Sequence, residues 1–191
     1  MGEIGQHPPV LFLLAAFSRR DEALAWGKAR AVERFGPLAL ESPAFDFSDT
    51  QYYKPTMGGP LLKRFWAFQR PIDPGDLVKI KHLTNDWEQE AASAVQAGAG
   101  GNLIANPGTE SRPLNLDPGY LTLAKLVLAS TKDHAHRIYL NQGVFAEVTL
   151  GYKHGAWQAH PWTFPDYRRP DYHQFFLECR KLVPRPAAEG A

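Results

Sequence analysis

Arg137 and Glu147 are two residues whose types and spacing suggest chemistry. They flank the loop Asn141-Gln142-Gly143, which has glycine last, as a bulged three-residue β-hairpin turn requires. If Leu140 pairs with Val144 in that hairpin, Arg137 lies opposite Glu147 on one face of the ribbon. Two interpretations follow. The pair is either a solvent-facing ion pair of little energetic weight, or a carboxylate that orients a guanidinium toward an anionic ligand.

Two lysines nearby favour the anion-binding interpretation. Asp117-Pro118 has the form of a helix start, with an N-cap aspartate and a proline at the first helical position. It predicts a helix from residue 118 to about 130, although an apolar run within it leaves a strand as the alternative. Lys125 and Lys132 fall on one face of that helix, and we expect this face to look across a cleft at Arg137. Such a cluster would hold a phosphate or a carboxylate, and a solvated helix face is the alternative.

Acidic and aromatic residues complete the predicted site. Asp117 and Glu147 are expected to orient the cations. If the protein is an enzyme, a question that the sequence leaves open, Glu147 and Asp166 are the candidates for proton transfer. The aromatic residues expected to pack on the organic part of the ligand are Tyr120, Trp162 and Tyr167. An aromatic-anchored loop is the alternative for the last two.

Other chemistries find little support. The sequence has no G-x-x-x-x-G-K-[ST] motif, no G-x-G-x-x-G after a predicted strand and no G-x-S-x-G. The single cysteine, Cys179, allows no internal disulfide and is expected in the core. His134 and His136 can share one side of an extended segment, as metal ligands do, but two histidines are more commonly ordinary polar residues, so no metal is predicted.

The elements that position these residues alternate along the chain. Residues 10–17 are a continuous apolar run, typical of a strand buried on both faces. Asp73-Pro74 is a clear helix start. The other predicted elements are a helix ending at Phe35, strands at 38–47, 61–71 and 113–116, hairpins over 137–161 and a final helix at 171–182. The glycine-rich segment 96–111 is either a linker or a loop over the site.

This order predicts an α/β (α+β) fold in one domain, residues 9–183, with flexible tails at 1–8 and 184–191. We expect a two-layer, ferredoxin-like, mostly antiparallel sheet, extended by the C-terminal hairpins, with the helices packed on one side.

Amino-acid composition limits the kinds of partner to be expected. The 191 residues are 44% hydrophobic and 21% charged, with a net charge of +1, which gives no reason to expect a nucleic-acid or membrane partner. The longest apolar run, residues 10–17, is far shorter than the roughly 20 residues of a membrane helix. The first residues lack the basic region of a secretory signal, so a cytoplasmic location is expected.

Several segments resemble a known bacterial family. They are Asn115–Tyr120, Lys125–Asp133, His136–Leu140, Ala146–Leu150 and Pro161–Arg168. They are similar to the family catalogued as domain of unknown function 4416, whose members are sometimes labelled GTP-binding proteins. Tyr52-Tyr53 and Met57-Gly58 match it as well, but Thr56 stands where the family usually carries a glutamate.

The functional expectation is therefore a cytoplasmic protein that binds a small anionic ligand, such as a nucleotide or a phosphorylated metabolite. The resemblance implies GTP as one such ligand, without a P-loop to hold it. The alternative is a non-catalytic protein–protein interaction or scaffold module, and a protein partner stays open. The sequence leaves open whether a cofactor is bound.

Overall fold

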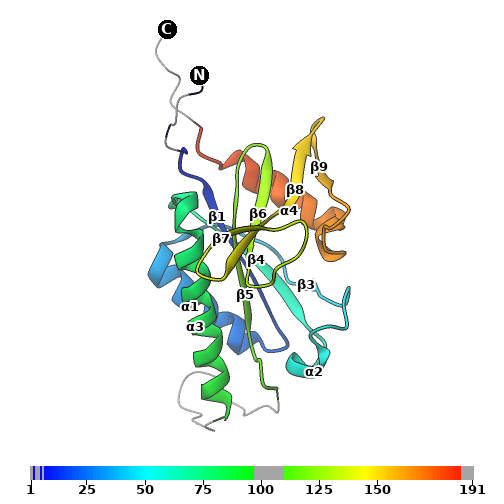
Figure 1. Cartoon of the computed structure of the whole chain (residues 1–191). Coiled ribbons are helices and arrows are strands. Elements are labelled where there is room, and N and C mark those ends of the chain that lie inside the picture. Colours follow the sequence, from blue (N-terminus) through cyan, green and yellow to red (C-terminus); the bar gives the residue numbers. More distant parts are fainter. Residues whose placement is uncertain (1, 3–4, 6, 97–109, 186–191) are drawn as a thin grey trace.

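An antiparallel sheet with helices on both faces forms the molecule (Figure 1). The computed structural model describes residues 2, 5, 7–96 and 110–185. The strands are β1 (Leu11–Ser18), β2 (Leu38–Glu41), β3 (Phe45–Asp46), β4 (Leu62–Phe68), β5 (Asn115–Leu121), β6 (Lys125–Ser130), β7 (Ile138–Asn141), β8 (Val144–Lys153) and β9 (Ala156–Ala159). The helices are α1 (Asp21–Phe35), α2 (Lys54–Met57), α3 (Leu77–Gln96) and α4 (Pro170–Lys181), with 3-10 turns η1 (Pro74–Asp76) and η2 (Asp166–Arg168).

The strand order is β2-β4-β1-β5-β6-β8-β7, with β3 also paired to β4 and β9 to β8. Every one of these pairings is antiparallel. The mixed α and β composition and the large antiparallel sheet are as predicted. The two hairpins of the second half extend the sheet beyond β5 and β6.

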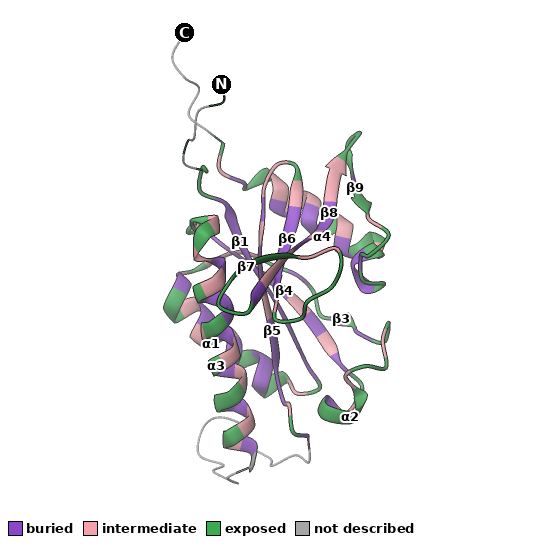
Figure 2. Ribbon diagram, in the orientation of Figure 1, coloured by how far each residue is buried: buried purple, intermediate pink, exposed green. Residues whose placement is uncertain are grey.

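Helices cover both faces, so the predicted two-layer arrangement with helices on one side is wrong. Side chains of β1 alternate between two cores. Phe12 and Leu14 pack with α1 and α3, whereas Leu11 and Leu13 pack with α4 through residues such as Phe176. Figure 1 shows α1 and α3 together on one side and α4 on the other. The physical reason is that β1 carries apolar side chains on both faces, and each face needs a cover. Figure 2 shows the strand in purple, buried along its length.

The predicted helix from residue 118 to about 130 is also wrong, because the segment forms β5 and β6. Asp117 does not cap a helix but lies opposite Ala15 in a ladder between β1 and β5. That ladder runs the full length of β5, and the apolar run Leu126–Ala129 continues the sheet in β6. Tertiary pairing thus overrides the local Asp-Pro signal, and Lys125 and Lys132 do not share a helix face.

Smaller differences lie at the ends of elements. The strand predicted over 38–47 is divided into β2 and β3, and the final helix starts one residue early. The helix start at Asp73 is confirmed, since its carboxylate accepts from the N–H of Gly75 at 2.7 Å. Most of the glycine-rich segment 96–111, and parts of both predicted tails, fall outside the described residues.

The hairpin between β7 and β8 has the predicted pairing of Tyr139 with Phe145, but its turn is tighter than expected. Asn141, and not Leu140, pairs with Val144. Gln142 and Gly143 both have positive φ, 49° and 76°, as a two-residue turn matching the strand twist requires. Leu140 is accommodated as an irregularity in the ladder.

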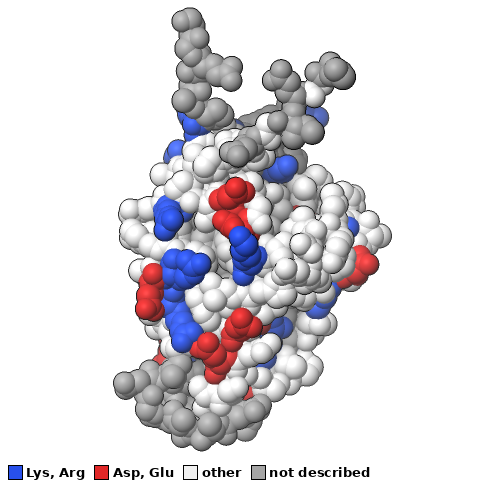
Figure 3. All heavy atoms as spheres, turned by 60° about the vertical axis from the view of Figure 1, so that its left-hand side comes forward, with Lys and Arg blue, Asp and Glu red and all other residues white. Residues whose placement is uncertain are grey.

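The described helices include none that is both long and apolar enough to cross a membrane. On the face brought forward in Figure 3, Lys and Arg side chains are interspersed with Asp and Glu side chains, so neither sign covers it.

Candidate functional site

The sheet opens between β5 and β6. These strands pair only from Gly119–Leu128 to Leu121–Leu126. The next residue of β5, Pro118, has no backbone N–H with which to continue the ladder. We call the unpaired stretch beyond this point the β5–β6 gap.

Side chains of α3 take the place of the missing strand at the β5–β6 gap. The N–H of Leu116 donates to Oε1 of Glu88 at 2.7 Å, and its C=O accepts from Nζ of Lys81 at 3.1 Å. The helix therefore satisfies both main-chain groups of a residue in the middle of the sheet, where an unpaired group would be costly. Lys81 is brought to Asp117 by the same geometry, with Nζ 3.3 Å from Oδ1.

A cavity of about 530 Å³, the central cavity, lies at this gap. Its lining includes Phe17, Phe47, Asp49, Thr50, Tyr52, Tyr53, Lys63, Lys81, Asn85, Arg112, Asn115, Asp117, Ser130, Lys132, His134, Arg137, Glu147, Phe164, Asp166 and Tyr167. Lys63, Asn115 and Asp117 belong to the sheet face that α4 covers farther along the strands, since they pair with Phe17 or Ala15 of β1. Polar residues thus replace apolar ones on this face beyond the N-terminal end of α4.

Arg137 and Glu147 meet at the cavity wall. Nε of Arg137 donates to Oε2 of Glu147 at 2.9 Å, and Nη1 donates to Oγ of Ser130 at 2.7 Å and to the C=O of Lys132 at 2.9 Å. The two charged side chains are only 3% and 2% exposed. The predicted pairing is confirmed, and its interpretation as a solvent-facing ion pair is wrong. His136 also contacts Oε2 of Glu147, at 3.0 Å.

Asp117 presents a carboxylate to the central cavity. Its side chain is 29% exposed, and Oδ2 accepts from Nδ2 of Asn115 at 2.7 Å. Burial by itself would raise the pKa of this carboxyl, but the charges of Lys81 and Lys63, followed by that of Arg112, outweigh it and hold the pKa below its ordinary value. The group is therefore an anion that a ligand can reach.

Lys63 and Asp166 form a second buried pair, with Nζ 2.6 Å from Oδ2. Aromatic rings surround the ammonium, and the nearest are those of Tyr167, centred at 4.3 Å, and Phe47, at 4.9 Å. Their negative faces add to the attraction of the carboxylate. The hydroxyl of Tyr167 is buried and has no hydrogen-bond partner among the described residues, and burial raises its pKa.

A lysine–tyrosine contact joins two loops beside the cavity. Nζ of Lys132 donates to Oη of Tyr52 at 2.7 Å and lies 4.0 Å from the centre of its ring. The hydrogen bond and the charge of Lys132 lower the pKa of Tyr52. Both residues are exposed, so this contact can open without disturbing the core.

The structure brings together six of the nine residues predicted for the site. Those lining the central cavity are Asp117, Lys132, Arg137, Glu147, Asp166 and Tyr167. Lys125 pairs with Gly151 at the other end of β6, so the expected convergence of Lys125, Lys132 and Arg137 is wrong. Tyr120 packs with the cluster of Leu77 and Val127 on the α3 side of the sheet.

Trp162, the remaining predicted residue, stacks between histidines. Its ring is 5.5 Å from that of His136 and 4.9 Å from that of His160, with nearly parallel planes, and His134 extends the column. Its Nε1 donates to the C=O of Val148 at 3.0 Å. Within the described part of the chain, no group of three or more His, Cys, Asp or Glu side chains is arranged to hold a metal ion.

Sequence reasoning missed Lys63, Lys81 and Arg112. A signal existed for the first two, because Lys63 alternates with the buried Phe65 and Ala67, and Lys81 follows Leu77 by four positions on α3. A charge within an apolar periodicity indicates a buried ion pair or a site. Arg112 gave no such signal. Its guanidinium reaches Glu88 at 2.8 Å and also contacts the side-chain oxygen of Asn115.

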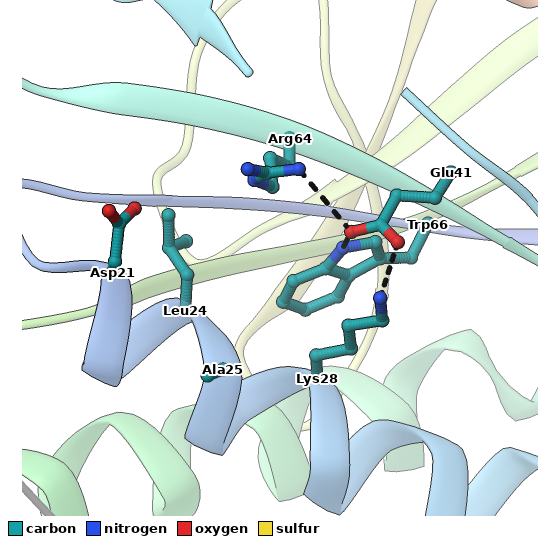
Figure 4. Close-up of a pocket in the computed structure, with 7 residues that line it drawn as sticks. All are labelled: Asp21, Leu24, Ala25, Lys28, Glu41, Arg64 and Trp66. Atoms are coloured by element: carbon teal, nitrogen blue, oxygen red, sulfur yellow. Dashed lines mark hydrogen bonds and ion pairs between the residues drawn. The ribbon is translucent and has the colours of Figure 1, made fainter. Parts of the chain in front are cut away.

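A smaller hollow of about 280 Å³ lies between α1 and the β2–β4 edge (Figure 4). Glu41 is its central charge. It accepts from Nε1 of Trp66 at 3.2 Å, lies 3.6 Å from Nη1 of Arg64 and is also bound by Lys28. Its carboxylate is thus engaged by side chains of the protein, and we place the candidate site in the central cavity.

Comparison with known proteins places the chain in a family. The model of the Domain of unknown function (DUF4416) family matches residues 8–182, which is most of the chain. The chain belongs to the DUF4416 family. No curated protein and no solved structure matches it. The DUF4416 match spans every described strand and helix, so the central cavity lies wholly within the family's domain.

Proposed function

We propose that this DUF4416 protein binds a small anionic ligand, such as a nucleotide or a phosphorylated metabolite, in the central cavity. The observation that carries the proposal is the placement of Arg137. Glu147, Ser130 and a main-chain carbonyl hold Nε and Nη1, whereas Nη2 has no hydrogen-bond partner among the described residues. A guanidinium held in this way at a cavity wall suits phosphate or carboxylate oxygens.

The rest of the lining supports an anionic ligand. Five Lys and Arg side chains line the cavity against four Asp and Glu side chains, and Lys132 is exposed with no carboxylate partner within the described residues. Tyr53 and Phe164 offer rings for the organic part of the ligand. Tyr167, whose buried hydroxyl has no hydrogen-bond partner among the described residues, also lines the cavity.

Lys132→Gln is the variant that tests this proposal. It removes an exposed cation of the cavity and should weaken binding of nucleotides and phosphorylated metabolites about fivefold, as expected for one charged contact of about 1 kcal/mol. Melting temperature against ligand concentration measures the effect. Lys125→Gln is the matched control, because Lys125 is also a lysine of the second half but does not line the cavity.

The expected result is a ligand-dependent rise in the melting temperature of the wild type and of Lys125→Gln, with a smaller rise for Lys132→Gln. If no phosphorylated compound raises the melting temperature of the wild type, the proposal is wrong. If the ligand-dependent rise in melting temperature is reduced equally in the two variants, the ligand binds outside the central cavity.

We assign Glu147 and Asp166 an orienting role. Each places a carboxylate oxygen close to a cation, Arg137 at 2.9 Å and Lys63 at 2.6 Å. These contacts support a role in which each acid holds its partner toward the cavity. Proton transfer by either residue, if the protein is an enzyme, would require that its ion pair opens.

The strand order β2-β4-β1-β5, with α1 and α3 on one face, supports assigning this part to a ferredoxin-like core. In this assignment β6 to β9 and α4 are additions, and the ligand site lies where they join the core. We propose a cytoplasmic location for the protein.

A second candidate function, protein–protein interaction, is favoured by β7. This strand is at one end of the sheet, and its residues Ile138, Tyr139 and Leu140 are 70%, 58% and 40% exposed. An apolar edge strand can accept an extended segment of another protein by strand addition.

Replacing both Ile138 and Leu140 by Lys tests the second function. It should abolish retention of a specific partner in pull-downs while leaving ligand-induced melting shifts unchanged. Light scattering of the purified wild type should show a monomer, since a dimer would make a second copy the occupant. Retention of the same partner by the doubly substituted protein would exclude β7 as the docking edge.

A further inference from the structure

The two sides of the β5–β6 gap differ in chemistry. Two residues beyond the pair Gly119–Leu128, Asp117 stands on β5 and Ser130 on β6. Because side chains alternate along a strand, both lie on the same face of the sheet as that pair, on opposite sides of the gap. Ser130 accepts a hydrogen bond from the guanidinium of Arg137. The carboxylate of Asp117 therefore lies across the cavity from this guanidinium.

The β6 side carries the cations that suit an anion. Arg137 is fixed there by Glu147 and Ser130, and Lys132 lies two residues beyond the end of β6. The main-chain carbonyl of Lys132 also accepts from Arg137, which ties the two residues together. An anionic group bound on this side would contact both.

The β5 side presents a carboxylate, and its cations are already paired with acids of the protein. Lys81 pairs with Asp117, Lys63 with Asp166 and Arg112 with Glu88. Asp117 is an ionised carboxylate with 29% of its side chain exposed. Asn85 of α3, four residues after Lys81, adds a neutral polar group. A carboxylate repels phosphate but accepts strong hydrogen bonds from hydroxyl groups.

We propose that the natural ligand is a phosphate ester of a polyhydroxylated compound, that is, a phosphorylated sugar or polyol. Its phosphate binds beside Arg137 and Lys132, and its hydroxyl groups donate to Asp117. The inference rests on the proposed function, since it divides the same cavity into a phosphate half and a hydroxyl half. A volume of about 530 Å³ is within the usual range for small-molecule sites.

Three classes of probe test the division by isothermal titration calorimetry. They are sugar phosphates of three to six carbons, including glucose 6-phosphate; hexyl phosphate, which has the charge without the hydroxyl groups; and glucose, which has the hydroxyl groups without the charge. At least one sugar phosphate should bind the wild type about tenfold or more tightly than hexyl phosphate, and glucose should bind more weakly than that sugar phosphate.

Asp117→Asn tests the role of the carboxylate. It keeps the size of the side chain and should weaken sugar phosphate binding about tenfold, while binding of hexyl phosphate stays the same or tightens because a repelling charge is gone. Asp133 is an exposed acid that does not line the cavity. Asp133→Asn should therefore leave the binding of both sugar phosphates and hexyl phosphate unchanged. Should Asp117→Asn fail to fold, the comparison of probes on the wild type still decides the question.

The failures are distinguishable. Two results would contradict the binding of hydroxyl groups by Asp117 but leave the proposed anion binding intact. One is that hexyl phosphate binds the wild type as tightly as every sugar phosphate. The other is that Asp117→Asn weakens the binding of both classes equally. If no phosphate-bearing probe binds, both the proposed function and this inference are overturned.

Discussion

Lys63→Met is expected to lower the free energy of unfolding by about 3–5 kcal/mol, the usual effect of removing one partner of a buried ion pair. Lys63 is 2% exposed, and its loss leaves the carboxylate of Asp166 buried beside aromatic rings without its cation. Methionine fills similar space but supplies no charge. Urea unfolding followed by circular dichroism measures the difference.

Two controls sharpen this test. Lys79→Met removes a lysine whose side chain is 82% exposed and should change stability by no more than about 0.5 kcal/mol. Combining Lys63→Met with Asp166→Leu removes both charges and should restore much of the lost stability, because the cost comes from the unpaired carboxylate. A loss below about 1 kcal/mol in Lys63→Met would mean that water reaches Asp166 and that the pair is not buried in solution.

Gly119→Ala is expected to cost about 3 kcal/mol or more, at the upper end of overpacking substitutions. A Cβ at this position would lie 2.4 Å from the carbonyl oxygen of Val127 and 2.6 Å from a methyl carbon of Leu128. The first contact cannot be avoided without moving the strands apart, because it is with the main chain of the paired strand. The leucine methyl can move by rotation of its side chain. Thermal unfolding and urea titration report the loss.

Gly151→Ala is the matched control, since Gly151 also lies in a strand of the same sheet. A Cβ there would be 3.5 Å from Nε2 of His160, which is ordinary contact. Its effect should stay within about 1 kcal/mol. Equal stability losses in the two alanine variants would contradict the close approach of β5 and β6 at Gly119.

The first half of the fold was predictable because local and tertiary preferences agree there. The apolar run of β1 needs cover on both faces, and Asp73 and Pro74 mark a helix start that the structure contains. At Asp117-Pro118 the two preferences disagree. The dipeptide has the form of a helix cap, yet the segment adds a strand beside β1, and no local pattern distinguishes a proline that begins a helix from one that ends a ladder.

The site was predictable only in part, for a related reason. The pair of Arg137 and Glu147 followed from hairpin register, which is local and depends on one turn. Lys63 and Lys81 enter the cavity from β4 and α3, and only the tertiary fold brings their side chains to the same cavity as Glu147 of β8. The meeting of these side chains in one cavity depends on contacts between residues distant in sequence. The periodicity within one helix or strand carries no information on such contacts.

The short ladder from Gly119–Leu128 to Leu121–Leu126 has a mechanical consequence. Within the described residues, it is the only strand pairing between β5 and β6. The sheet therefore consists of two parts, β2-β4-β1-β5 and β6-β8-β7, which are joined by this short ladder. Bending at this short ladder would change the width of the cavity while each part of the sheet keeps its own strand pairing. A molecule held by Asp117 on one part and Arg137 on the other would act as a clasp, and its binding energy would be coupled to the angle between them.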